Sequence, residues 1–212
     1  MKIVAFVPIK LKSQRLPNKM LLPLGEGKIL CQHIFNTLLE VKKVIDLDIY
    51  CYCSDETIIQ YLPTDIFFLK RSNALDSDET KGMDIYQSFV NTINSDIYLL
   101  CHATSPYIKK ESILKGLNSI MIYGYDSAFS CSKVKTFCWY NDKPLNYNLD
   151  NIIRTQDIEP VYWETSAFYM FTKDVIRNKK RIGVNSYKVE TDRIESIDID
   201  ELEDYQIALK CF

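Results

Sequence analysis

Glycine is scarce in this protein, with only six glycines among 212 residues. The sequence contains neither a Walker-type phosphate loop nor a Gly-x-Gly-x-x-Gly fingerprint, the two motifs that hold phosphate groups with the backbone of glycine-rich turns. If the protein binds a phosphorylated ligand, charged side chains must therefore supply much of the anion binding.

Long apolar runs and zinc-type cysteine pairs are also missing. No apolar stretch approaches membrane-spanning length, and the sequence opens on a strand-like segment instead of a signal peptide. A net charge of −2 offers no bulk attraction for nucleic acid. The odd number of seven cysteines favours reduced, buried thiols over a disulfide framework. We expect a cytoplasmic protein that binds neither membrane nor nucleic acid.

The composition is that of an ordinary globular protein, with 47% hydrophobic and 25% charged residues. We expect one domain, residues 1–212, in which strands alternate with helices and form a three-layer α/β sandwich with a mainly parallel sheet. The expected strands are 2–7, 48–54, 66–69, 96–101, 127–131 and about 195–199. The expected helices are 29–41, 83–93, 111–123 and about 201–209.

Residues 133–170 interrupt this alternation. The segment is rich in aromatic residues, and its pattern predicts β-hairpin structure laid over the sheet. Near the second strand, Ser54-Asp55-Glu56 is typical of a helix N-cap with acidic residues in the first turn, although a ligand-binding role is the alternative.

A basic loop follows the first strand. It carries Lys10, Lys12, Arg15 and Lys19 without an acidic residue among them. In a parallel α/β sheet the carboxyl end of a strand is where ligands bind, and clustered cations are suited to a phosphate chain. A solvated basic loop is the alternative.

Two further features contain side chains that could take part in catalysis or metal binding. Asp198 and Asp200 would point the same way on a strand and could jointly hold Mg²⁺, which prefers oxygen ligands; the alternative is an acidic surface cluster. His102 ends the most strand-like run and is either a structural hydrogen-bonding residue, a donor to a substrate hydroxyl or a general base.

Several motifs, in order along the chain, resemble the sugar-acid cytidylyltransferases. The pattern from Pro8 to Lys19 is similar to the nucleotide-binding loop of that family, except that residues 9–12 read Ile-Lys-Leu-Lys where Ala-Arg-x-Gly is common. The resemblance implies nucleotide binding by Pro8, Lys10, Ser13, Arg15 and Lys19, with Arg15 and Lys19 also catalytic.

Later motifs extend the resemblance over essentially the whole chain. Arg71 and Thr80 fall in a second nucleotide-binding patch, and the turn His102-Ala103-Thr104-Ser105-Pro106 resembles Gln-Pro-Thr-Ser-Pro. Residues 154–162 resemble a sugar-site motif, whereas Thr165-Ser166 replaces the usual Asn-Gly. The implied substrate-binding residues are His102, Thr104, Ser105, Arg154, Gln156 and Tyr162. Asp198 and Asp200 match the magnesium carboxylates of the family, and Asp200 is implied to be catalytic.

The resemblance implies a Rossmann-like α/β nucleotidyltransferase that uses Mg²⁺ and forms a homodimer through the 133–170 segment. The reaction would be CMP transfer from CTP to a 2-keto-3-deoxy sugar acid, with release of pyrophosphate. A nonulosonate is the expected acceptor, and 3-deoxy-manno-octulosonate is the alternative. Two other functions remain open, namely a sugar-1-phosphate nucleotidyltransferase and a non-catalytic nucleotide-binding protein.

Overall fold

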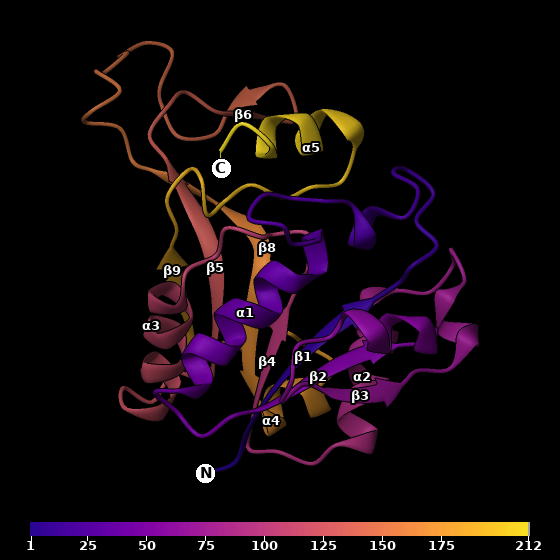
Figure 1. Ribbon diagram of the computed structural model, residues 1–212. Coiled ribbons are helices and arrows are strands. Elements are labelled where there is room, and N and C mark those ends of the chain that lie inside the picture. The colour runs from indigo at the N-terminus through magenta and orange to yellow at the C-terminus, as the bar shows by residue number, and fades with distance from the viewer. Residues whose placement is uncertain (212) are drawn as a thin grey trace.

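The computed structural model describes residues 1–211 and contains a seven-stranded sheet between two layers of helices (Figure 1). The sheet strands are β1 (Ile3–Ile9), β2 (Asp48–Cys53), β3 (Phe67–Lys70), β4 (Ile97–Cys101), β5 (Ser127–Val134), β8 (Val161–Thr172) and β9 (Ser186–Glu190). The α-helices are α1 (Leu30–Lys42), α2 (Gly82–Thr92), α3 (Lys110–Met121), α4 (Lys173–Arg177) and α5 (Leu202–Ala208). Within residues 1–211, no helix is long and apolar enough to cross a membrane.

The sheet has the order β3-β2-β1-β4-β8-β5-β9 and is mainly parallel, as predicted. β1 pairs in parallel with β2 and β4, β2 with β3, and β5 with β9. β8 runs antiparallel between β4 and β5. The carboxyl ends of β1, β2, β3 and β4 therefore meet at one edge of the sheet, where the basic loop begins.

The alternation of side chains along β1 creates the three layers. Ala5 and Val7 belong to the core cluster that includes α1 and α3, whereas Val4 and Phe6 belong to the cluster that includes α2 and α4. Phe6 stacks on Phe89 of α2 with 4.1 Å between ring centroids. The Rossmann-like sandwich thus follows from a strand that is apolar on both faces.

One predicted strand is wrong. Residues 195–199 form no strand; the edge strand is β9, at Ser186–Glu190. The carboxylate of Asp192 accepts hydrogen bonds from the backbone amides of Ile194 and Glu195, which folds the chain into a turn. Ile199 then makes a single backbone hydrogen bond, to Thr104 O at 2.8 Å, so that the segment is held without a ladder.

The 133–170 segment differs from the prediction in its second half. β6 (Trp139–Tyr140) and β7 (Lys143–Pro144) form a small antiparallel pair within residues 133–163, which we call the arm. The arm extends the β5–β8 ribbon beyond the carboxyl edge of the sheet, as Figure 1 shows. β8 itself is not laid over the sheet but inserted into it, because nine of its residues have partners on β4 or β5.

Capping at the end of β2 is observed, although the helix there is a short 3₁₀ segment, η2 (Glu56–Tyr61). The carboxylate of Asp55 accepts a hydrogen bond from the backbone amide of Thr57 at 3.0 Å. The capping interpretation of Ser54-Asp55-Glu56 therefore accounts for Asp55 without a ligand.

β8 contains a bulge beside β4. In the pairing with β5, Tyr169 lies opposite Phe129 and Glu164 lies opposite Cys131. Four residues of β8 therefore lie where β5 has only one, Ser130. Ser166, within this bulge, has a φ of 61°, a left-handed conformation that strains a residue with a Cβ. Bulges of this kind redirect side chains and are common next to active sites.

Replacing Ser166 with glycine should therefore stabilise the protein. Glycine adopts a positive φ without the steric cost, and we expect the free energy of unfolding to rise by about 1 kcal/mol in urea denaturation. Ser166→Ala is the matched control, because it removes the hydroxyl and retains the strain. Equal stabilities of the two variants would show that the backbone at this position is not strained.

Candidate functional site

The basic loop and the C-terminal Asp-x-Asp meet in space. The ammonium group of Lys19 lies 2.9 Å from Asp200 Oδ1 and donates to Ile199 O at 2.8 Å. Arg15 approaches the other oxygen, with Nη1 2.9 Å from Asp200 Oδ2. The structure thus brings together the three residues predicted to be catalytic, with Lys19 buried and Arg15 exposed.

The two aspartates of the motif have opposite pKa shifts. Burial raises the pKa of Asp198, opposed in part by Thr104 and Lys19. Burial also acts on Asp200, but the hydrogen bond and charge of Lys19, together with Arg15, outweigh it and lower the pKa of Asp200. At neutral pH Asp200 is therefore a firmly ionised group beside two cations.

Packing holds the Asp-x-Asp segment in place. Ile199 belongs to a small core cluster with Leu16, Leu24, Leu30 and Ala208, which lies between the basic loop and α5. Asp204 accepts the backbone amides of Asp200 and Glu201 at 3.0 and 2.8 Å and so caps α5. Both ends of the segment are thus fixed although it belongs to no strand.

Asp198 and Asp200 are the residues that could hold a magnesium ion, and both oxygens of Asp200 are paired with Lys19 and Arg15 in this structure. Asp198 Oδ1 is buried and has no hydrogen-bond partner within residues 1–211, which leaves a desolvated oxygen next to the carboxylate of Asp200. No cluster of three or more acidic, histidine or cysteine side chains suited to a metal occurs in the same range. A site with two carboxylates suits Mg²⁺, which usually completes its coordination with water and substrate phosphates.

A groove separates the basic loop from the 70–78 connection. It has a volume of about 760 Å³ and is continuous in its lining with a pocket of about 440 Å³ that includes Ser13, Arg15 and Lys19. Asp78 links the two walls, because it pairs with Lys10 Nζ at 3.2 Å and accepts from Gln14 Nε2 at 2.6 Å. Triphosphate contacts by Lys10 would require this exposed pair to open.

Arg71 is only 2% exposed, and its guanidinium is used within the protein. It donates to Ile9 O at 3.1 Å and forms an ion pair with Asp76, which also accepts from Ser54. In this arrangement Arg71 fixes the 3₁₀ segment η3 (Asn73–Asp76) next to the basic loop.

Thr80 and Pro8 were also predicted to bind the nucleotide. The hydroxyl of Thr80 lies 3.4 Å from Ala74 O, within the connection that contains η3. Pro8 lies within β1, opposite Tyr52 of β2.

His102 lies at the carboxyl end of β4 and faces the bulge of β8. Its amide donates to Ala167 O at 3.0 Å, and its ring Nε2 is 3.4 Å from the hydroxyl of Tyr86. Burial lowers the pKa of His102 to about 4, so the imidazole is neutral at pH 7. This favours hydrogen bonding to a substrate over proton abstraction, since a base with so low a pKa is weak. Ser105, which directly follows Thr104, is buried.

Sequence reasoning missed four residues around His102. Tyr169 donates to Glu164 Oε2 at 2.7 Å, and Arg181 Nη2 lies 2.9 Å from the same oxygen. The Arg181 guanidinium stacks over the Tyr169 ring at 4.0 Å and also interacts with Tyr86. No spacing in the sequence signals this cluster, because its members come from α2, β8 and the connection after α4.

The residues of the predicted sugar-site motif lie on the arm. Arg154 is exposed and forms a two-point pair with Asp157 at 2.7 Å. Gln156 is exposed, and Tyr162 donates to Glu190 on β9 at 3.2 Å. Within residues 1–211 the side-chain contacts of these three residues stay on the arm and β9, and the structure does not bring them to His102 or the basic loop.

The comparisons with known proteins identify the family of this chain. The sequence model of a protein family described as cytidylyltransferase matches residues 4–209. The chain belongs to the cytidylyltransferase family.

Individual relatives are distant. The N-acylneuraminate cytidylyltransferase of Streptococcus agalactiae serotype III is 24% identical over 217 residues, covering 97% of this chain and 52% of the relative. That of Oncorhynchus mykiss is 29% identical over 149 residues, covering 66% of this chain and 34% of the relative. The chain thus spans about half, or less, of the length of these curated relatives.

Solved structures share the fold. A CMP:2-keto-3-deoxy-manno-octonic acid synthetase complexed with CTP has a TM-score of 0.68 at 15% identity, covering 100% of this chain and 98% of that one. The 4-diphosphocytidyl-2C-methyl-D-erythritol synthase of Anaerococcus prevotii has a TM-score of 0.67 at 15% identity, covering 99% and 95%. At such identities the likeness concerns the fold of this cytidylyltransferase.

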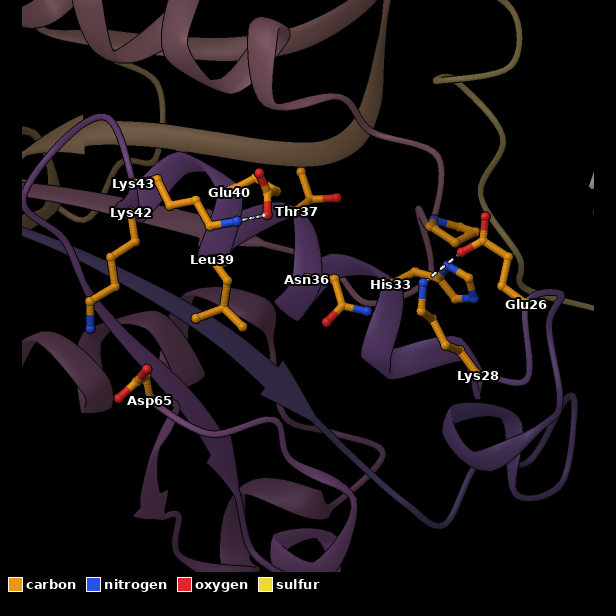
Figure 2. Close-up of a pocket in the computed structure, with 11 residues that line it drawn as sticks. Glu26, Lys28, His33, Asn36, Thr37, Leu39, Glu40, Lys42, Lys43 and Asp65 are labelled. Carbon is orange, nitrogen blue, oxygen red and sulfur yellow. Dashed lines mark hydrogen bonds and ion pairs between the residues drawn. The ribbon is translucent and has the colours of Figure 1, made fainter.

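Two pockets of this cytidylyltransferase, each of about 830 Å³, lie away from the candidate site, one between α3 and β9 and one along α1. The pocket along α1 contains none of the site residues predicted from the sequence. Figure 2 shows that its charged side chains are directed at one another, Lys28 at Glu26 and Lys43 at Glu40. Exposed pairs of this kind leave little charge for a ligand.

The pKa of His102 leads to a test of its environment. Because the folded-state pKa, about 4, lies below the ordinary value of 6.5, the unfolded chain binds the proton first and stability falls as the pH drops from 6.5 to 4. The loss attributable to His102 is at most about 3 kcal/mol.

We therefore expect His102→Gln to lose less stability than the parent between pH 6.5 and pH 4, measured by urea denaturation. His33, the other histidine of the sequence, is present in both proteins, so its contribution cancels in the comparison. Parallel stability curves for the two proteins would mean that His102 is not desolvated.

Proposed function

We propose that this protein transfers CMP from CTP to the anomeric hydroxyl of a 2-keto-3-deoxy sugar acid and releases pyrophosphate. The observation that carries the proposal is the convergence of Arg15 and Lys19 with Asp200, beside Asp198 and the 102–106 turn. One edge of the sheet thus carries several cations that could contact a triphosphate, two carboxylates and a polar turn. Membership of the cytidylyltransferase family supports the same reaction.

The protein's role in such a transfer is positioning and charge neutralisation, since the chemistry is an in-line attack on phosphorus. Arg15, Lys19 and, once freed from Asp78, Lys10 would bind the triphosphate. Their charges would stabilise the departing pyrophosphate. Arg71 supports this site from below by fixing the connection at Asp76.

Asp198 and Asp200 would hold Mg²⁺, which supplies positive charge at the phosphates when bound. The burial of Asp198 fits this role, because a cation would replace the solvation that its carboxylate has lost. Asp200 would in addition keep Lys19 and Arg15 in register with the phosphates. The neutral ring of His102 would donate to or accept from a hydroxyl of the acceptor.

The acceptor is proposed to be a nonulosonate, and two relatives named N-acylneuraminate cytidylyltransferase support this choice. The octulosonate alternative is supported by the fold neighbour named CMP:2-keto-3-deoxy-manno-octonic acid synthetase. Because both classes share the 2-keto-3-deoxy acid unit, the reaction is the same and only the contacts to the remote carbons of the sugar differ.

Pyrophosphate release with CTP, Mg²⁺ and a panel of sialic, legionaminic, pseudaminic and octulosonic acids tests the proposal. We expect turnover with at least one nonulosonate. Turnover restricted to the octulosonate would select the alternative acceptor. If no acid supports pyrophosphate release from the full chain, the proposed function is wrong.

Asp198→Asn tests the metal site in the same assay. We expect pyrophosphate release to fall by at least ~100-fold, because several kcal/mol of charge stabilisation is lost with the ion. CTP binding and the fold should persist, since burial already disfavours the charged form of Asp198. Asp46→Asn, an exposed carboxylate between α1 and β2, is the matched control and should leave activity unchanged. Full activity of Asp198→Asn would exclude Asp198 as a metal ligand.

We also propose that the protein is a homodimer whose interface includes the arm. Trp139 and Tyr140 on β6 are 56% and 67% exposed, and Ile152 and Trp163 are 65% and 58% exposed. Apolar side chains gathered on one projecting segment are typical of an interaction surface. A second copy would also bring the exposed Arg154 of its arm towards another molecule, where a sugar carboxylate could replace Asp157.

Analytical ultracentrifugation tests the dimer. The parent should sediment as a dimer, and the double variant Trp139→Ser, Ile152→Ser should sediment as a monomer with an unchanged circular dichroism spectrum. Val184→Ser, a substitution at a residue that is 93% exposed and lies next to β9, is the control and should remain dimeric. A monomeric parent at micromolar concentration would contradict the proposal.

A further inference from the structure

A polar cluster extends from His102 away from the basic loop. The His102 ring faces Tyr86 at 3.4 Å and Tyr169 with 6.2 Å between ring centroids. Beyond them lie Glu164 and Arg181, joined at 2.9 Å and both a little more than one third exposed. These side chains present hydrogen-bonding groups to solvent at the carboxyl edge of the sheet. Arg181 belongs to none of the motifs found in the sequence.

The functional groups along this edge have a definite order. Asp200 couples to Arg15 and Lys19 at one end, and Asp198 is coupled to both Asp200 and Thr104. His102, two residues before Thr104, follows. Arg181, whose charge acts on His102 and on Tyr86, lies at the other end. His102 thus lies within electrostatic range of both Asp200, at the basic loop, and Arg181.

The chemistry of the acceptor determines which of its groups reaches Arg181. In a 2-keto-3-deoxy acid the carboxylate is bonded to the anomeric carbon, which also carries the attacking hydroxyl. The carboxylate must therefore stay near the α-phosphate and the aspartates. What extends past His102 towards Arg181 and Glu164 is the part of the sugar ring remote from the anomeric carbon.

We infer that Arg181 and Glu164 form the specificity-determining wall of the acceptor site and recognise an acylamino substituent on the remote side of the sugar ring. An amide presents a carbonyl acceptor and an N–H donor side by side. The guanidinium of Arg181 donates to the carbonyl oxygen, and the carboxylate of Glu164 accepts the N–H. This inference rests on the proposed function and assigns its acceptor to the acylamino sugar acids.

The local structure maintains this wall as a hydrogen-bonding surface. The Tyr169 ring supports the guanidinium at 4.0 Å and its hydroxyl holds Glu164 at 2.7 Å, so both charged groups have fixed positions. Burial raises the pKa of Tyr169 to about 12, so its hydroxyl remains a donor. The strained bulge at Ser166 lies between Glu164 and Tyr169 and aims both at the cluster. Charges held in this way discriminate strongly against a ligand that leaves them unpaired.

The test compares two acceptors that differ only in this substituent. We would measure kcat and KM with N-acetylneuraminate and with its deaminated analogue, in which a hydroxyl replaces the acetamido group. The parent should prefer the acylamino acid by about 10²-fold in kcat/KM. Arg181→Met should abolish most of this preference by raising KM for the acylamino acid, with the KM for CTP unchanged.

Two further variants make the result specific. Arg177→Met is the control, because Arg177 on α4 carries the same charge and its side chain is 64% exposed. This variant should leave kcat and KM for both acceptors unchanged. Glu164→Gln retains an acceptor oxygen and should lose less of the preference than Glu164→Ala. A general loss of packing would instead lower turnover with both acceptors and raise the KM for CTP.

Four outcomes would overturn the inference. In the first two, Arg181→Met leaves the preference intact, or it impairs both acceptors equally, which would make the pair structural. A parent that uses only the octulosonate has no acylamino group to recognise. A parent inactive with every sugar acid would refute the proposed function itself, and this inference with it, whereas an active parent with an unaffected Arg181→Met refutes the inference alone.

Discussion

The carboxylate of Asp200 is the contact on which the candidate site depends. Lys19 is buried, and a buried ammonium group is tolerated only when a charge and hydrogen bonds replace its solvation. Asp200, 181 residues away in the sequence, supplies that charge, and Ile199 O supplies a further hydrogen bond. The same carboxylate holds Arg15 at the surface. One side chain therefore closes the basic loop against the C-terminal segment and gives the site its geometry.

The antiparallel insertion of β8 explains the second half of the site. A strand that enters between β4 and β5 from the opposite direction brings its bulge next to the carboxyl end of β4. Ser166 and Tyr169 thereby reach His102, and Glu164 reaches Arg181. The cost is a left-handed backbone at Ser166. Such strain persists because pairing on both sides of the bulge holds the strand in place.

The two halves of the site differ in their electrostatics. At the basic loop, Lys10, Lys12, Arg15 and Lys19 line the smaller pocket together with one carboxylate, Asp78, so its lining is net positive. Around His102 the imidazole is neutral, and Arg181 is balanced by Glu164. The first region is suited to phosphates and the second to neutral hydrogen-bonding groups. The Asp198–Asp200 segment lies at the boundary between them.

The sequence by itself determined the class of fold and one side of the site, because those properties are encoded locally. Apolar runs and helical periodicity specify the layers, and four cations within ten residues mark the basic loop. The strand predicted at residues 195–199 is wrong. Its alternating apolar and acidic residues are typical of a strand, but hydrogen bonds to Asp192 fold the chain into a turn just before it. Only the tertiary structure decided that Arg71 is buried against Asp76, that Arg154 lies on the arm, and that Arg181 acts on His102 while paired with Glu164. Those contacts join residues from separate elements, and their energies depend on burial and distance, which no local pattern contains.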